Sequence, residues 1–80
     1  MKAILWSKYH CPYCDQAYTL LKSKGYQVEE RKIGDGYSKE ELLEAVPNAR
    51  SVPQIFIEDG YVGGFNELKE YLKWLIPKKN

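Results

Sequence analysis

The sequence predicts an α/β domain built on one mixed four-stranded sheet with helices on both faces. A strand–helix–strand pattern in the first half makes its two strands parallel, because such crossovers are right-handed and return to the same sheet. An Asp-Gly pair at residues 59–60 separates two short apolar runs, which is typical of an antiparallel hairpin. A Cys-Pro-Tyr-Cys motif at residues 11–14 lies where the first strand passes into the first helix.

The first half of the chain follows this pattern closely. Residues 3–6 are an apolar run of the length of a buried strand. Pro12 suits the first turn of the next helix, where a missing N–H leaves nothing unpaired. Gly25 ends this helix after two lysines, and residues 27–33 alternate weakly as a second strand. The apolar face of the helix carries Ala17, Leu20, Leu21 and, at its edge, Tyr18.

The second half begins with a turn at residues 34–36. It then predicts a helix, a hairpin and a last helix, in that order. Ser38 and Glu41 form a capping box, and the helix that it opens ends at residues 47–48. Residues 55–57 and 61–62 are the two hairpin strands. We expect Asn66 to cap the last helix, whose inner face carries Leu68, Tyr71, Leu72 and Leu75.

Size and composition restrict the class of protein. Eighty residues correspond to one domain, which we expect to span 1–80. A net charge of +1 gives no indication of a nucleic-acid partner. The apolar stretch at residues 1–6 is too short for a signal peptide or a membrane span, so we expect a cytoplasmic protein without a membrane partner. In that reducing compartment a Cys-x-x-Cys motif is more often catalytic or metal-binding than structural.

The two cysteines predict dithiol chemistry with a redox-active disulfide. Cys11 falls at the cap of the first helix, where free N–H groups and the helix dipole lower the pKa of its thiol. Its thiolate would attack a disulfide sulfur, and Cys14, one turn later and more buried, would then attack Cys11 and release the reduced product. Lys8 and a protonated His10 would add positive charge, although a solvated His10 without a role is the alternative.

Three competing roles for the cysteine pair are less favoured. A structural disulfide would close too short a loop to stabilise the fold much. A zinc site would need two further ligands beside the pair, and His10 is the only histidine, so we predict no metal. Two unrelated thiols would leave the proline and the strand–helix setting unexplained.

Two further segments admit two interpretations each. Residues 51–54 read Ser-Val-Pro-Gln, and a proline is permitted at the first residue of any strand. The alternative is a cis Val52–Pro53 bond that turns the main chain of Val52 toward an extended substrate. The glycines at 63–64 either make only a tight turn or let a ligand approach the backbone before the last helix, whose N-terminus suits a carboxylate.

Together these segments resemble the glutaredoxin family over nearly the whole chain. Residues 11–14 are similar to its dithiol active site, and Lys8 matches a lysine usual three residues before it. Residues 51–57 resemble the family segment Thr-Val-Pro-Gln-Ile-Phe-Ile, and residues 62–68 resemble Ile-Gly-Gly-x-x-Asp-Leu. The resemblance implies a thioredoxin fold in its minimal β-α-β-α-β-β-α form.

The resemblance also implies glutathione as co-substrate, with no bound cofactor. By this likeness the lysine at position 8 contacts the glycyl carboxylate, Val52 pairs through its main chain with the cysteinyl unit, and the Val52–Pro53 bond is cis. Residues 64–67 hold the γ-glutamyl end. Glu67 stands where the family usually has Asp, and Asn66 where Ser or Asp is common, so the contacts to the α-amino group stay open. The residues implied around glutathione are Lys8, Tyr13, Arg50, Val52, Pro53, Gly64, Phe65, Asn66 and Glu67.

We therefore expect a monomeric oxidoreductase that reduces protein disulfides and glutathione mixed disulfides in electron transport and cell redox homeostasis. Ribonucleotide reductase is a candidate protein substrate. One alternative is a similar electron donor recharged by thioredoxin reductase. Another is a non-catalytic carrier of a two-iron cluster, but such glutaredoxins more often have Ser or Gly where this chain has Pro12.

Overall fold

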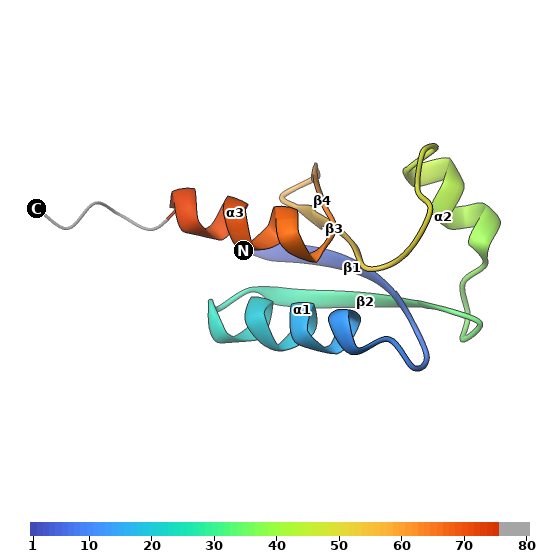
Figure 1. The fold of residues 1–80 in the computed structure, drawn as a ribbon, viewed down its shortest axis with the longest axis horizontal. Helices are drawn as coiled ribbons and strands as arrows, with labels where there is room; N and C mark the ends of the chain where they lie inside the picture. Colours follow the sequence, from blue (N-terminus) through green and yellow to red (C-terminus); the bar gives the residue numbers. More distant parts are fainter. Residues whose placement is uncertain (76–80) are drawn as a thin grey trace, which may run out of the picture.

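The seven predicted elements are present in the predicted order. The computed structural model describes the backbone of residues 1–75 and the side chains of residues 1–73. Of the residues expected on the inner face of the last helix, the side chain of Leu75 lies outside this part. The elements are β1 (Lys2–Lys8), α1 (Pro12–Ser23), β2 (Gln27–Ile33), α2 (Lys39–Ala45), β3 (Gln54–Ile57), β4 (Gly60–Gly63) and α3 (Phe65–Leu75) (Figure 1).

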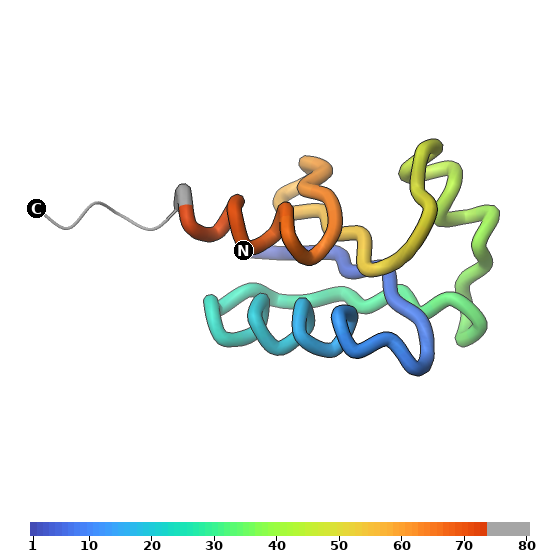
Figure 2. Tube along the Cα trace, in the orientation of Figure 1, coloured from blue at the N-terminus to red at the C-terminus, as the bar shows by residue number. Residues whose placement is uncertain are grey.

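The strands form one mixed sheet in the order β2-β1-β3-β4. β1 pairs with β2 in parallel, from Lys2 opposite Gln27 to Lys8 opposite Ile33. β3 pairs antiparallel with both β1 and β4. Figure 2 traces the path from β1 through α1 back to β2 and, after α2, into the hairpin. Because β1 is a central strand, the loop that follows it lies at the middle of one end of the sheet. This loop carries the cysteine motif.

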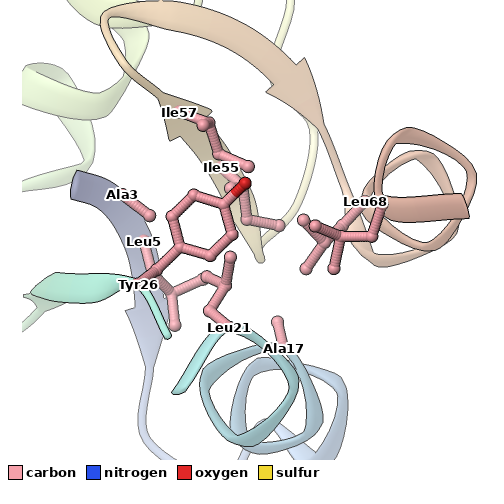
Figure 3. Packing of buried hydrophobic residues seen from close by; sticks show 9 residues of the cluster. Ala3, Leu5, Ala17, Leu21, Tyr26, Ile55, Ile57 and Leu68 are labelled. Atoms are coloured by element: carbon pink, nitrogen blue, oxygen red, sulfur yellow. The ribbon is translucent and has the colours of Figure 1, made fainter. Parts of the chain in front are cut away.

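Side-chain alternation along β1 divides the core between the two faces of the sheet. Ala3 and Leu5 face a cluster that α1 and α3 cover. Figure 3 shows Ala17 and Leu21 of α1 meeting the strand side chains there, with Leu68 of α3 alongside. This cluster contains Ala3, Leu5, Ala17, Leu21, Tyr26, Ile55, Ile57, Leu68 and Leu72.

Helix α2 packs on the opposite face, at one end of the sheet (Figure 1). There Trp6, only 2% exposed, packs with Leu42 and Val46. The predicted placement of helices on both faces is therefore confirmed. None of the helices in the described residues has the length and apolar character that a membrane crossing requires.

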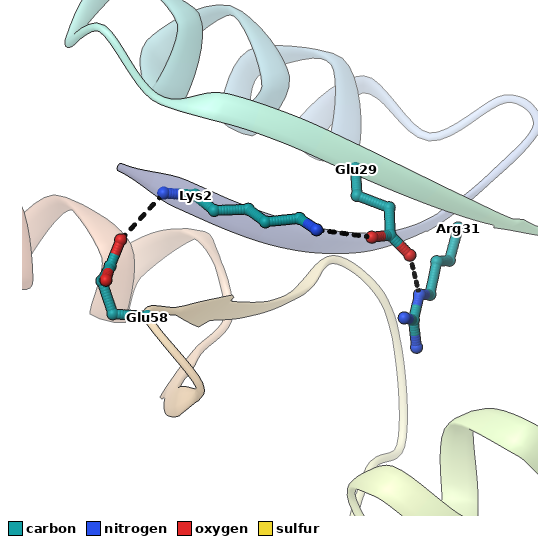
Figure 4. Close-up of polar contacts among 4 residues, drawn as sticks. All are labelled: Lys2, Glu29, Arg31 and Glu58. Carbon is teal, nitrogen blue, oxygen red and sulfur yellow. Dashed lines mark hydrogen bonds and ion pairs between the residues drawn. The ribbon is translucent and has the colours of Figure 1, made fainter.

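Lys2, Glu29 and Arg31 connect the first two strands on the α2 face (Figure 4). The Glu29 carboxylate lies 2.7 Å from Arg31 Nε and 3.6 Å from Lys2 Nζ. The pKa of Glu29 is lowered, chiefly by the hydrogen bond from Arg31 and against a smaller opposing effect of burial. The Arg31 guanidinium also lies 5.3 Å from the ring centre of Trp6, so this network covers the edge of the α2 core.

Local sequence signals set most helix boundaries, with one correction. The capping box is confirmed: Ser38 Oγ accepts from the Glu41 N–H at 3.1 Å, and Glu41 Oε1 accepts from the Ser38 N–H at 2.7 Å. The prediction that Asn66 caps α3 is wrong, because the helix already begins at Phe65. Glu67 reaches back to the N–H of Gly64 at 3.0 Å, which makes Gly64 the residue before the first turn.

Strand β1 also runs further than the predicted residues 3–6. Its pairing with β2 continues through the polar residues Ser7 and Lys8. Ser7 is fully buried, and its hydroxyl donates to Glu30 of β2 at 2.7 Å. A buried hydroxyl with a partner costs little, so the strand continues past its apolar run to the edge of the cysteine loop.

Candidate active site

The cysteine pair lies at the N-terminus of α1 as a disulfide between Cys11 and Cys14. Cys11 is the N-cap residue, and its Sγ accepts the backbone N–H of Cys14 at 3.1 Å. Cys14 is 1% exposed and Cys11 is 8% exposed. The sulfur nearer to solvent is therefore the one at the helix N-terminus, where a negative charge is best stabilised.

The loop before β3 lies against this sulfur. The Val52–Pro53 peptide bond is cis, as the family resemblance implied. The carbonyl oxygen of Val52 is 3.8 Å from Cys11 Sγ. The N–H of Val52 donates no hydrogen bond within the described residues. The half-buried Val52 thus presents free main-chain groups directly beside the disulfide.

Two side chains that the sequence analysis did not place in the site hold this loop. Gln54 Nε2 donates to the carbonyl oxygen of Ser51 at 2.9 Å, and Tyr61 donates its hydroxyl to Gln54 Oε1 at 2.6 Å. Burial, and then the charge of Glu67, raise the pKa of Tyr61, so its hydroxyl keeps its proton to a higher pH than an ordinary tyrosine. Gln54 belongs to the motif at residues 51–54, but its partner on β4 is not visible in the sequence.

A groove of about 630 Å³ opens beside the disulfide. Its wall contains the rings of Tyr13 and Phe65, which are tilted by 36° and have their centres 5.7 Å apart. Seven of the nine residues predicted to surround glutathione line it: Tyr13, Val52, Pro53, Gly64, Phe65, Asn66 and Glu67. These residues come from three segments that are distant in sequence.

The glycines at 63–64 make room for a charged side chain. Gly63 has φ +126, and a Cβ there would lie 2.8 Å from both Cβ and Cγ of Glu67. A Cβ on Gly64 would lie 3.3 Å from Glu67 Oε1. The glycines therefore let Glu67 fold back over the turn and accept the Gly64 N–H, so that its carboxylate lines the groove.

Lys8 and Arg50, the other two predicted glutathione residues, line a separate groove. This second groove has a volume of about 240 Å³ and shares Ser51 and Val52 with the first. His10 is exposed in the loop after β1, with a left-handed φ of 57. The structure thus places cations on one side of Val52 and the α3 N-terminus on the other.

The loop that carries the cysteines is attached to the end of β2. The Tyr9 hydroxyl donates to the carboxylate of Asp35 at 2.9 Å, and this bond raises the pKa of Tyr9. Lys32 Nζ lies 4.5 Å from the centre of the Tyr9 ring. Within the described residues, no group of three His, Cys, Asp or Glu side chains is arranged to hold a metal ion.

A mixed sheet with a disulfide at the N-terminus of α1 and a cis-proline loop against it defines a thiol–disulfide oxidoreductase. Comparison with known proteins narrows this class. The glutaredoxin family model matches residues 3–62. A probable glutaredoxin of Synechocystis is 41% identical over 64 residues, which cover 79% of this chain and 70% of the relative. Glutaredoxin 3 of Escherichia coli is 38% identical over 64 residues, covering 80% and 77%.

Solved structures with a similar fold are also glutaredoxins. Glutaredoxin 1 from Francisella tularensis superposes with a TM-score of 0.79 at 27% identity, covering 96% of this chain and 98% of that one. A buckwheat glutaredoxin–glutathione complex has a TM-score of 0.74 at 24% identity, covering 89% and 67%.

The chain therefore belongs to the glutaredoxin family. This confirms the predicted thioredoxin fold and the predicted class, a glutathione-dependent thiol–disulfide oxidoreductase that uses glutathione as substrate and not as a bound cofactor.

Proposed function

We propose that Cys11 and Cys14 together reduce protein disulfides and glutathione mixed disulfides, and that glutathione then reduces the pair again. One observation carries the proposal. The Cys11 sulfur lies at the α1 N-terminus, 3.1 Å from the Cys14 N–H and 3.8 Å from the carbonyl oxygen of Val52, a residue that lines both grooves. A thiolate there is stabilised and has the main-chain N–H and C=O groups of Val52 beside it for a peptide to pair with.

The reaction proceeds by two exchanges of sulfur bonds. The Cys11 thiolate attacks one sulfur of the substrate disulfide, which forms a mixed disulfide and expels the other sulfur as a thiolate. Cys14 then attacks Cys11, which closes the disulfide and releases the reduced substrate. The substrate gains two electrons, and the cysteine pair supplies them. Two molecules of glutathione return the pair to the dithiol and leave as glutathione disulfide.

For glutathione itself we assign the cysteinyl unit to the main chain of Val52. The glycyl carboxylate then points to Lys8 and Arg50, and Tyr13 and Pro53 border the tripeptide. At the other end, Gly64 donates its N–H to Glu67 Oε1, and we assign the first-turn N–H groups of Phe65, Asn66 and Glu67 to the γ-glutamyl carboxylate. The second oxygen of Glu67 is our candidate partner for the α-amino group, in place of the aspartate that the family usually has.

The cellular setting follows as a set of proposals. We expect one domain over residues 1–80 that acts as a monomer in the cytoplasm. Its protein substrates are enzymes that form a disulfide during turnover, with ribonucleotide reductase as a candidate. A Cys-x-x-Cys pair that must be reduced again after each turnover suits a reducing compartment, which supports the location, and the small size of the carrier supports the monomer.

Disulfide reduction by the purified protein, coupled to NADPH, tests this function. One assay supplies glutathione and glutathione reductase, and the other supplies thioredoxin reductase alone. We expect turnover only with glutathione. Turnover only with thioredoxin reductase would preserve the dithiol chemistry and refute the glutathione site. Visible absorbance after anaerobic reconstitution with iron and sulfide would instead favour the cluster carrier.

A further inference from the structure

The second groove combines positive charge with an apolar floor. It lies between the ends of β1 and β2, the helix α2 and the loop before β3. Three cationic side chains line it: Lys8, Lys39 and Arg50. The rest of the lining is Ile33, Leu42, Leu43, Ala49, Ser51 and Val52. A ligand seated there would therefore meet cations and aliphatic surface together.

The three cations are available to a ligand. Lys8, Lys39 and Arg50 are exposed, and in the described part of the chain none of them forms an ion pair or a side-chain hydrogen bond. No carboxylate lines the groove. Glu41 of α2 does not line it and accepts the N–H of Ser38. The charged side chains that line the groove are therefore all positive, and they attract a carboxylate.

The floor of the groove is fixed by the α2 core. Leu42 is buried, and Ile33, Ala49 and Val52 pack against the same cluster as Trp6. Leu43 is half-buried on the next position of the helix. A floor held by packed side chains is preformed, so an aliphatic side chain can bind it without ordering the protein first.

The direction of a bound chain follows from the proposed function, on which this inference rests. If the cysteinyl unit of glutathione lies at Val52 and its glycyl end at Lys8, the chain runs from the first groove into the second. A protein substrate joined to Cys11 runs the same way, and its residues after the reactive cysteine enter the second groove. Unlike glutathione, it extends far enough to meet Leu43 and Lys39.

We propose that this groove selects protein substrates in which the reactive cysteine is followed by an aliphatic and then an acidic residue. The aliphatic side chain covers Leu43 and Ala49, and the carboxylate lies between Lys39 and Arg50. The groove thereby gives the enzyme a preference among protein disulfides that does not depend on glutathione.

Symmetrical disulfides of blocked peptides test the proposal, because either sulfur then gives the same product. The peptides are acetyl-Ala-Cys-Leu-Glu-amide and its Leu-Gln and Leu-Lys counterparts, together with acetyl-Glu-Leu-Cys-Ala-amide. They react with the reduced Cys14→Ser protein, so the reaction stops at the mixed disulfide. Each attack by Cys11 forms one Cys11–peptide disulfide and expels one peptide thiolate, which is measured by mass spectrometry and chromatography.

We expect the Leu-Glu peptide to react about five-fold faster than the Leu-Lys peptide at low salt, as for one or two partly exposed ion pairs. The Leu-Gln peptide should fall between them, and salt at about 0.5 M should reduce the difference by screening. Lys39→Glu should remove or reverse the preference. Lys22→Glu makes the same charge change on an exposed residue at the far end of α1 and should leave it intact.

Equal rates for all the peptides would overturn this inference while the proposed function stands. If Lys22→Glu lost the preference equally, the preference would come from the net charge of the protein, and the proposed role of the groove would be refuted. A similar gain for the peptide with its acid before the cysteine would overturn the direction. If neither the peptides nor glutathione disulfide forms a mixed disulfide with Cys11, the proposed function itself is wrong.

Discussion

The backbone N–H of Cys14 points at the Sγ of Cys11 across 3.1 Å, so the reactive sulfur is also the cap of helix α1. The first N–H groups of a helix have no partner within it, and a side chain at the N-cap commonly accepts one of them. Here a sulfur takes that place. The same contact that begins the helix favours a thiolate on Cys11 once the disulfide is reduced, which joins the fold of the loop to its chemistry.

The two cysteines should be separable by substrate. Cys11→Ser should abolish reduction of every substrate, because Cys14, the other cysteine, is only 1% exposed. Cys14→Ser should retain reduction of glutathione mixed disulfides, which needs one thiol, and lose dithiol reduction of a protein disulfide. Steady-state rates with a glutathionylated peptide and with a disulfide protein measure the two activities. Equal loss of both in Cys14→Ser would contradict this division.

Gly63→Ala should destabilise the protein more than Gly36→Ala does. Both glycines have positive φ, of +126 and +96, and alanine at either position carries a backbone penalty of about 1–2 kcal/mol. At Gly36 a Cβ meets nothing within 4 Å, whereas at Gly63 it lies 2.8 Å from Glu67. Urea unfolding of both variants measures the difference. Equal free energies of unfolding would mean that Glu67 yields without cost.

Glu67→Gln should separate the two tasks of this side chain. Its amide oxygen can still accept the Gly64 N–H, so the free energy of unfolding should change little. Glu67→Ala removes this acceptor and should lower it by about 0.5–1 kcal/mol. Both variants lose the negative charge and should raise the KM for glutathione, which steady-state kinetics measures. Glu70→Gln, exposed on the same helix, is the control. An unchanged KM in both variants would remove Glu67 from the glutathione site.

Glu29 should make the stability depend on acid pH. Arg31 lowers the pKa of Glu29 in the folded protein. The stabilisation that Glu29 contributes is therefore complete above its pKa in the unfolded chain, 4.5, and is lost as the pH falls through its folded-state pKa. Glu29→Gln should therefore be less stable at pH 7, by no more than about 1 kcal/mol for a partly exposed pair.

The difference from the parent protein should vanish in acid, and unfolding in urea across this range measures it. Glu44→Gln removes an exposed carboxylate that has no ion pair within the described residues, and it serves as the matched control. A Glu29→Gln deficit that persists at the lowest pH would assign the effect to packing around Arg31 and Trp6.

The sequence by itself determined the order of the elements, the capping box of α2 and the position of Cys11 at the start of α1. Each of these depends on residues within one or two turns of each other, so local propensity is sufficient. It also determined the family, since the segments at residues 11–14, 51–57 and 62–68 can be recognised one after another.

Only the tertiary structure decided how these segments meet. Helix α3 begins at Phe65 and not after Asn66, because Glu67 finds the N–H of Gly64 when it folds over Gly63. Lys8 and Arg50 separate from the α3 residues into a second groove, because α2 and the end of β1 lie on the opposite side of Val52. The contact between Glu67 and Gly64 is local, but it needs the turn at Gly63 that ends β4. The second groove joins residues distant along the chain, so its geometry exists only once the sheet and α2 are packed.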